Sequence, residues 1–391
     1  MKILIITDAW FPQVNGVVTT LSNVAYQLRS KGHVVDIIDP SRFKTLPLPG
    51  YREIRISLNL GELKKIIKFN RYDAIHIATE GPLGLMARYL LIKNNLSFTT
   101  AVHTKFPEYV KARIGFPLSW GYVLMRWFHG AAFHNLVNTQ SHKDELISWN
   151  FKNLVMWDRA IDHNIFNADH PKIEFSEPYL LYAGRIAVEK NIESFLKLKT
   201  SQKKVIVGDG PQRKELERKY PDAKFIGYKK EIELARWYEG ADAFVFPSKT
   251  DTLGIVLLEA LACGTPIAAY PVTGPKDLIV NGVNGFTDDN LLNAIDQAVK
   301  VSSSDCIDFA SCFTWDKVAE QFIIMCQLQK ALNQVTKTAR DLISQYGDDA
   351  ESIAMLRAAE YAANLNHSEW KIWEEVLSRV IELQNAKHLD S

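Results

Sequence analysis

The stretch SKTDTLGIVLLEALACGTPIAAY, residues 248–270, reads as a loop, a short apolar helix and a following strand. If the helix begins near Gly254, the N–H groups of Leu253, Gly254 and Ile255 lack helical partners, and together with the helix dipole they form an anion site. Glu259 would then lie roughly 7 Å along the axis, at about 1.5 Å per residue. This spacing predicts a phosphate at the helix start and an attached ribose beside Glu259. Asp251 is expected beyond the phosphate, toward solvent.

Outward from this stretch, short apolar runs alternate with helical stretches along most of the chain. The expected strands are 179–182, 204–207, 223–225, 243–246 and 266–269 in the second half, and 2–7, 34–38, 74–77 and 98–102 in the first. Helical spacing covers 17–31, 60–69 and 83–94. This alternation is typical of parallel sheets covered by helices. The sequence therefore predicts an α/β protein of two doubly wound, Rossmann-like domains that face each other across a cleft.

Residues 162–178 interrupt the alternation with Asp, His, Asn and Pro. We expect an N-terminal domain at 1–165, a C-terminal domain at 166–313 and a crossover helix at 314–330. Residues 331–391 read as two or three amphipathic helices, at 341–345, 350–364 and 368–385, which form an appended helical module. The module is expected to serve self-association or a protein partner, or to pack against the two domains.

Bulk composition excludes several classes of protein. With 391 residues, 47% hydrophobic content and a formal net charge of +1, the chain is globular and has no overall attraction to nucleic acid. Residues 41–71 hold eight Lys or Arg against two acids, which we interpret as solvated helix faces and loops. Four cysteines without a CxxC pair indicate a reduced, cytosolic protein that could work at the inner face of a membrane.

In doubly wound folds ligands bind where strands lead into helices at their carboxyl ends, so the loops there hold the candidate residues. Arg185 and Lys190 follow one expected strand, and two such cations can grip a diphosphate. Gly208 follows the next strand, and Gly16 precedes the first helix; both permit close approach of backbone to a ligand. His103 follows a strand of the first half and would face Asp251. The N-terminal loop lacks GxGxxG, which counts against a dinucleotide-dependent oxidoreductase.

The acid, seven residues and Glu within LLEALACGTP resemble the signature of retaining glycosyltransferases of family four, which have the two-lobed GT-B fold and use nucleotide-sugar donors. GRIAVEKNI at 184–192 resembles the family's diphosphate-binding motif, and HTKFPEY at 103–109 resembles an α-mannosyl-, sulfoquinovosyl- and phosphatidylinositol-mannosyltransferase subgroup. The family usually has Glu where this chain has Asp251. The resemblance implies that the terminal helix crosses back onto the first domain.

The resemblance implies a retaining hexosyltransferase that moves mannose from GDP-mannose, or glucose from a UDP donor, to a lipid or glycan hydroxyl. Arg185, Lys190, His103 and Asp251 are the expected catalytic residues, and Gly16, Gly208, Leu253, Gly254 and Glu259 are expected to bind the donor. No Asp-x-Asp triplet or zinc-ligand spacing is present, so neither a metal nor another cofactor is expected. The alternatives are a nucleotide-sugar epimerase or phosphorylase of the same fold, and an inactive binding protein.

The apolar stretch 114–137 is interrupted by Pro117, Arg126 and His129, so it does not read as a membrane span. Its first part, 114–129, is rich in aromatic residues. It could contact a lipid or form buried helix surface. We interpret it as buried surface, and peripheral membrane contact stays open as an alternative.

Overall fold

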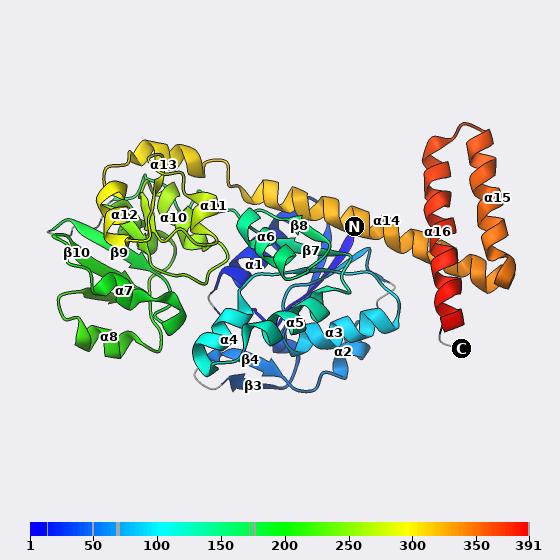
Figure 1. Ribbon diagram of the computed structural model, residues 1–391, viewed down its shortest axis with the longest axis horizontal. Helices are drawn as coiled ribbons and strands as arrows, with labels where there is room; N and C mark the ends of the chain where they lie inside the picture. Colours follow the sequence, from blue (N-terminus) through cyan, green and yellow to red (C-terminus); the bar gives the residue numbers. More distant parts are fainter. Residues whose placement is uncertain are drawn as a thin grey trace.

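The computed structural model describes residues 1–13, 15–48, 51–67, 71–171, 173, 175 and 177–389. It contains two six-stranded sheets, each in its own lobe, and a long helix that runs from one lobe across the other (Figure 1). Strand order is β2-β1-β5-β6-β7-β8 in the N-terminal lobe and β11-β10-β9-β12-β13-β14 in the C-terminal lobe. All neighbouring strands of these two sheets pair in parallel. The predicted fold class of two doubly wound α/β domains with a C-terminal helical segment is confirmed.

The N-terminal lobe is built from apolar strands whose side chains are buried on both faces, as in Ile3, Leu4, Ile5 and Ile6 of β1. Its elements are β1 Lys2–Ile6, α1 Gly16–Ser30, β2 Val34–Ile38, η1 Pro40–Arg42, β3 Thr45–Leu48, β4 Tyr51–Ser57, α2 Glu62–Ile66, β5 Ala74–Ile77, α3 Pro82–Lys93, β6 Thr99–Ala101, α4 Phe106–Ile114, α5 Leu118–His129, β7 His134–Val137, α6 Gln140–Ser148 and β8 Leu154–Met156. Strands β3 and β4 form a separate antiparallel hairpin. The basic stretch 41–71 includes this hairpin, and residues 49–50 and 68–70 within it lie outside the described part of the chain.

The C-terminal lobe repeats the same winding. Its elements are β9 Tyr179–Ala183, η3 Val188–Lys190, α7 Ile192–Leu196, β10 Lys203–Val207, α8 Arg213–Lys219, β11 Lys224–Gly227, α9 Glu231–Glu239, β12 Ala243–Phe246, α10 Ile255–Ala262, β13 Ile267–Ala269, α11 Pro275–Leu278, β14 Gly285–Thr287, α12 Leu291–Ala298 and α13 Ser303–Ala310. The two cores meet in the connecting segment, because Trp157 and Ala160 pack in the N-terminal core while Ile161 and Phe166 pack in the C-terminal core.

Helix α14, Trp315–Tyr346, crosses back onto the N-terminal lobe, as the resemblance implied (Figure 1). Its residues Trp315, Val318 and Phe322 join the N-terminal core. The buried Gln329 side chain bonds the backbone N–H and C=O of Ile75 at 3.2 Å each. The expectation that this helix ends near residue 330 is wrong: it contains no Gly or Pro and continues to Gly347, whose φ is +58°. The separate helix expected at 341–345 is its last turn and a half.

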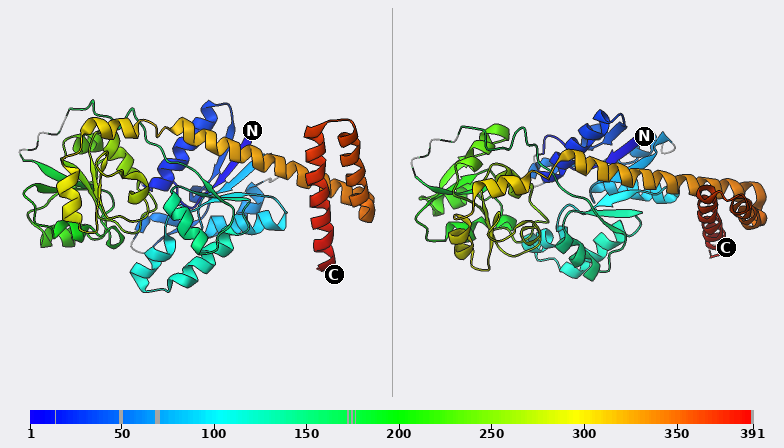
Figure 2. Two further views of the ribbon diagram at one scale, coloured as in Figure 1. Left: turned by 45° about the horizontal axis from the view of Figure 1, so that its top comes forward. Right: turned by 90° about the horizontal axis from the view of Figure 1, so that it is seen from above.

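The last helices, α15 Ala350–Ala363 and α16 His367–Leu389, form an antiparallel pair. They pack against each other and against the end of α14 through a small core of Val335, Ala339, Ala354, Val376 and Val380. Figures 1 and 2 show this pair standing apart from both lobes at the far end of α14. Packing of α15 and α16 against the two domains, one of the two expected arrangements, is therefore not what the structure shows.

Candidate active site

The order of strands reverses at one point in each sheet, between β1 and β5 in the N-terminal lobe and between β9 and β12 in the C-terminal lobe. The loops that leave neighbouring strands at such a point diverge to opposite faces of the sheet and open a place for a ligand. In the C-terminal lobe these are the loops that follow Ala183 and Phe246. They carry Arg185 and Lys190 on one side and Asp251 on the other.

An ion pair joins the two loops at this point. Lys190 Nζ lies 2.5 Å from Asp251 Oδ1, and both side chains are largely buried. The sequence predicted the two residues but not their contact. It was also wrong about Asp251, which is 9% exposed and does not face solvent. Lys190 ends the short 3-10 turn η3, and Asn191 in the left-handed region, with φ of +52°, separates it from α7.

Helix α10 begins at Ile255, with Gly254 as its N-terminal cap. Gly254 has φ of +85°, and a Cβ atom there would lie 2.9 Å from Cζ of Phe246. Both the backbone conformation and the space therefore require glycine. No side chain caps this helix, and in the described part of the chain the N–H groups of Leu253 and Gly254 donate to no backbone C=O group. The N–H groups at the helix start can thus bind an anion, as the sequence predicted.

Glu259 is the fifth residue of α10, as the sequence predicted from the helix start. Its Oε2 accepts a hydrogen bond of 3.0 Å from the Tyr238 hydroxyl. Burial raises the pKa of this carboxyl to about 7, and the hydrogen bond from Tyr238, which favours the ionised form, offsets only part of that effect. Glu259 can therefore change its charge near neutral pH.

His103 lies against the Asp251 loop, because its backbone C=O accepts a hydrogen bond of 2.9 Å from the Thr252 hydroxyl. Its Nδ1 lies 3.0 Å from Nη2 of Arg159, and a guanidinium can only donate. Nδ1 therefore accepts and the ring proton resides on Nε2. Burial, with a smaller contribution from the Arg159 charge, holds the pKa of His103 well below its usual value. The ring is neutral, with one N–H to donate.

Arg159 is a residue of this site that the sequence analysis did not select. It is 6% exposed, lies 4.9 Å from the centre of the Trp157 ring, and donates to the backbone C=O groups of Trp157 and Asp158. Burial lowers its pKa to about 10, so the guanidinium remains charged. The sequence contained a signal for Arg159, because this residue follows the carboxyl end of β8, as His103 follows that of β6. The fold brings these two strand ends together.

The predicted glycines have different roles in the structure. Gly208 follows β10 and donates its N–H to the C=O of Gly227 at 2.9 Å, and a Cβ atom on it would lie 1.9 Å from the C=O oxygen of Gly184. Packing between loops thus explains Gly208, and its contact with a donor stays a prediction. Gly16 begins α1, and a Cβ atom there would lie 3.4 Å from Ile255. The starts of α1 and α10 therefore face each other between the lobes.

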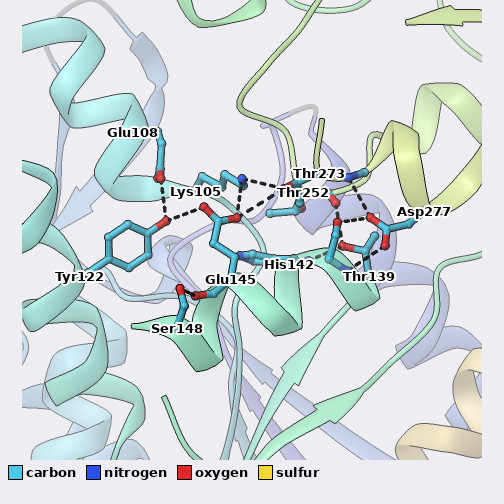
Figure 3. Close-up of polar contacts among 12 residues, drawn as sticks. Lys105, Glu108, Tyr122, Thr139, His142, Glu145, Ser148, Thr252, Thr273 and Asp277 are labelled. Atoms are coloured by element: carbon cyan, nitrogen blue, oxygen red, sulfur yellow. Dashed lines mark hydrogen bonds and ion pairs between the residues drawn. The ribbon is translucent and has the colours of Figure 1, made fainter. Parts of the chain in front are cut away.

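Polar contacts hold the two lobes together beside these residues (Figure 3). Lys105 of the N-terminal lobe pairs with Glu145 at 2.6 Å and donates to Thr273 of the C-terminal lobe at 3.0 Å. The Thr139 hydroxyl donates to the C=O of Thr252 at 3.3 Å. The lobes thus touch on the side of the Asp251 loop. Within the described residues, no group of three or more His, Cys, Asp or Glu side chains could hold a metal ion.

Comparison with known proteins shows the family of this chain. The family model for glycosyl transferases group 1 matches residues 166–303, and the model for glycosyltransferase family 4 matches residues 14–165. Together the two matches span both lobes. The chain is a glycosyltransferase enzyme with the GT-B fold, and it belongs to glycosyltransferase family four.

Two relatives and one solved structure illustrate the similarity. A GDP-mannose-dependent alpha-mannosyltransferase of Corynebacterium glutamicum is 28% identical over 327 residues, which are 76% of this chain and 78% of the relative. An alpha-monoglucosyldiacylglycerol synthase of Streptococcus pneumoniae is 26% identical over 317 residues, 69% of this chain and 71% of the relative. The structure of a sucrose-phosphate synthase from Thermosynechococcus elongatus superposes with a TM-score of 0.67 at 19% identity, covering 83% of this chain and 98% of that one. Because the chain is a glycosyltransferase, the alternative of an inactive binding protein no longer applies.

Proposed function

We propose that this enzyme is a retaining hexosyltransferase that moves a hexose from a nucleoside diphosphate sugar to the hydroxyl of a lipid. The donor is GDP-mannose or a UDP-hexose, and the transfer takes place at the cytoplasmic face of a membrane. The first relative is named for GDP-mannose and the second for a glucosylated diacylglycerol. Those names support a nucleotide-sugar donor and a lipid acceptor here.

The observation that carries the proposal is the ion pair between Lys190 and Asp251. It places a cation and a carboxylate together at the switch point of the C-terminal sheet, beside the open start of α10. The negative charge of a diphosphate can replace the Asp251 carboxylate as the partner of the Lys190 ammonium. That exchange would release the Asp251 carboxylate to accept hydrogen bonds from the hydroxyls of the donor hexose.

Departure of the nucleoside diphosphate is the step that this arrangement favours. As the bond between the sugar and the phosphate breaks, negative charge grows on the diphosphate. Lys190, Arg185 and the N–H groups at the start of α10 would stabilise that charge in the transition state more strongly than the charge of the ground state. Glu259 would accept hydrogen bonds from the ribose.

Retention of configuration follows if the acceptor attacks from the face that the diphosphate leaves. The leaving phosphate then takes the proton of the acceptor hydroxyl. The neutral His103 ring suits a donor of one hydrogen bond to a sugar hydroxyl rather than a base, because its Nδ1 is occupied by Arg159. In this proposal the Asp251 carboxylate, once released from Lys190, binds hydroxyls of the hexose and does not attack its anomeric carbon.

A screen tests donor, acceptor and reaction together. The full chain is incubated with GDP- and UDP-sugars, with and without a lipid extract, and release of the nucleoside diphosphate is measured. We expect release that depends on the extract with one donor, and a product whose anomeric configuration by NMR equals that of the donor. An inverted product would contradict the retaining mechanism.

The matched variants are Lys190→Ala and Lys197→Ala. Lys197 also pairs with a carboxylate, that of Glu193 at 3.3 Å, but on the exposed surface of the same lobe. Transfer is expected to fall about 10²-fold or more in the first variant and to stay near normal in the second. Of the two remaining alternatives, an epimerase or a phosphorylase of the same fold, an epimerase would convert the nucleotide sugar without any extract.

A further inference from the structure

Helix α5 carries apolar side chains on both of its faces. Its inner face, with Tyr122, Met125 and Phe128, is buried in the N-terminal lobe. Its outer face carries Trp120, Val123, Leu124 and Trp127, which are 67, 50, 56 and 53% exposed. These four follow the spacing i, i+3, i+4, i+7 and form one stripe. The interpretation of residues 114–129 as buried surface is therefore wrong for this half of the helix.

The neighbouring helix α3 extends the stripe. Arg88 of α3 donates to the backbone C=O groups of Phe128 and Trp127 at 2.9 and 2.8 Å, and its guanidinium lies 4.0 Å from the centre of the Trp127 ring. Leu85 and Tyr89, on either side of Arg88 in the sequence, are 41 and 56% exposed. Figures 1 and 2 show α3 and α5 together along one edge of the N-terminal lobe. We call this surface the α3–α5 face; it consists of Leu85, Tyr89, Trp120, Val123, Leu124 and Trp127.

The helices that form this edge are strongly basic. Helices α3, α4 and α5 contain five Lys or Arg residues and a single acid, Glu108. That acid accepts a hydrogen bond of 2.6 Å from the Tyr122 hydroxyl and is partly buried. Lys93 lies 6.0 Å from the centre of the exposed Tyr89 ring. The α3–α5 face therefore combines exposed aromatic and aliphatic side chains with positive charge.

The face also adjoins the candidate active site. Helix α4 begins at Phe106, three residues after His103, and the Phe106 side chain is 46% exposed. Lys105 between them turns inward to Glu145 and Thr273, so the chain passes directly from the site to the exposed surface. An acceptor hydroxyl held at this surface would approach the donor site from the N-terminal lobe.

We propose that the α3–α5 face is a membrane-docking surface that inserts Trp120, Leu124 and Trp127 among the headgroups of an anionic phospholipid bilayer. Tryptophan favours this interfacial depth because its ring is apolar and its N–H needs a polar partner. Arg88 and Lys93 of α3, beside the Trp127 and Tyr89 rings, and the exposed Lys111 of α4 supply attraction to acidic lipids. In the described residues no helix is long and apolar enough to cross a bilayer, so attachment through this face is peripheral. The inference rests on the proposed function for the lipid acceptor that gives the surface its role.

Binding to vesicles tests the proposal without donor or acceptor, so its failure is separate from failure of the transferase assay. The full chain is floated with vesicles of phosphatidylglycerol and phosphatidylcholine, and with vesicles of phosphatidylcholine alone. We expect stronger binding to the anionic vesicles, reduced several-fold by 0.5 M salt. The double variant Trp120→Gln and Trp127→Gln should bind about tenfold more weakly or worse.

The control is the double variant Ile324→Gln and Leu328→Gln, which removes two exposed aliphatic side chains one turn apart on α14. It should bind vesicles like the unaltered chain, and thermal melting should show both variants folded. Equal vesicle binding by the Trp120/Trp127 variant, or no binding by the unaltered chain, would overturn the proposal. A dimer that dissociates only in the Trp120/Trp127 variant would assign the face to a second copy of the chain instead, which also overturns it.

Discussion

At the scale of single residues, Lys190 and Asp251 form an ion pair before a donor binds. Both are enclosed, with side-chain exposures of 22 and 11%, so their attraction is stronger than that of a surface pair. Removal of one partner takes away the opposite charge beside the other in a partly buried place. In the proposed reaction the two separate, the ammonium to the diphosphate and the carboxylate to the hexose.

Substitution of Asp251 separates these two tasks. Asp251→Asn removes the charge that competes for Lys190, so the nucleoside diphosphate should bind as tightly as before or more tightly. Transfer should fall about 10²-fold or more, because the hexose loses a charged acceptor of hydrogen bonds. Calorimetry with GDP and UDP, together with turnover measurements, checks both halves. Diphosphate binding that weakens as much as turnover would contradict the exchange of partners.

Glu259 makes a prediction about pH. Burial raises its pKa to about 7 from an ordinary value of 4.5, so between these values the folded protein keeps a proton that the unfolded chain has lost. Stability from this group therefore decreases as pH rises through that window and stays low above it. Glu259→Gln should raise the free energy of unfolding at pH 8 by about 2 kcal/mol in the absence of ligand. Denaturant titrations at pH 5 and pH 8 measure the difference.

The same variant should lose affinity for the nucleotide, because a neutral amide replaces the ionised carboxylate that would accept from the ribose. Affinity of the unaltered enzyme should also decrease as pH falls below about 7, where Glu259 gains its proton. If the nucleotide affinity of the unaltered chain did not change between pH 6 and pH 8, Glu259 would not be one of the residues that bind the nucleotide.

At the scale of elements, the start of α10 depends on one glycine. Gly254→Ala forces a Cβ atom against Phe246 at 2.9 Å and strains a backbone with φ of +85°. We expect a loss of about 1–2 kcal/mol in stability and a clear loss in nucleotide affinity, because the N–H groups beside it move. Gly347→Ala is the control, since Gly347 also has positive φ but has open space around it. It caps the end of α14, and that end lies far from the C-terminal lobe (Figure 1). Equal nucleotide affinity in both variants would contradict the anion site.

The elements also show what the sequence could predict. Periodicity located most strands of both sheets, and it placed Glu259 at the correct depth in α10, because both follow from local spacing. The hairpin β3–β4 and the strands β7, β8 and β14 were not predicted; β8 and β14 have only three residues each. Short strands at a sheet edge carry little periodic signal.

Contacts between loops could not be predicted in the same way. The pair of Lys190 and Asp251, and that of His103 and Arg159, each join residues more than fifty positions apart. They exist because strand order brings separate strand ends to one edge, and order is a property of the whole sheet. Exposure of Trp120 was missed for a related reason. An apolar helix is expected to be buried, and only the packed lobe shows that one of its faces is left uncovered.

At the scale of the whole molecule, α14 joins the lobes and the appended helices. Its first half completes the N-terminal core, and Gln329 and Asn333 bond the backbone at Ile75 and Ser97. Beyond these contacts the helix leaves the lobe, touching it again through Arg340, whose guanidinium lies 3.2 Å from the C=O of Asn95. The module at 331–391 therefore lengthens the molecule at the far end of α14 and does not line the candidate site (Figure 2).

Truncation after Lys330 tests this division. The shortened chain keeps Gln329, all of the N-terminal core and every candidate site residue, and it loses α15, α16 and the small core that they share with the end of α14. We expect turnover with the screened donor and lipid acceptor to stay within about twofold of the full chain, with thermal stability lowered only slightly through loss of the Asn333 and Arg340 contacts. Light scattering on both chains shows whether the module also mediates self-association. A tenfold or greater loss of turnover in a folded, truncated chain would mean that the module completes the site, and if the full chain alone is a dimer, it would do so from the second copy.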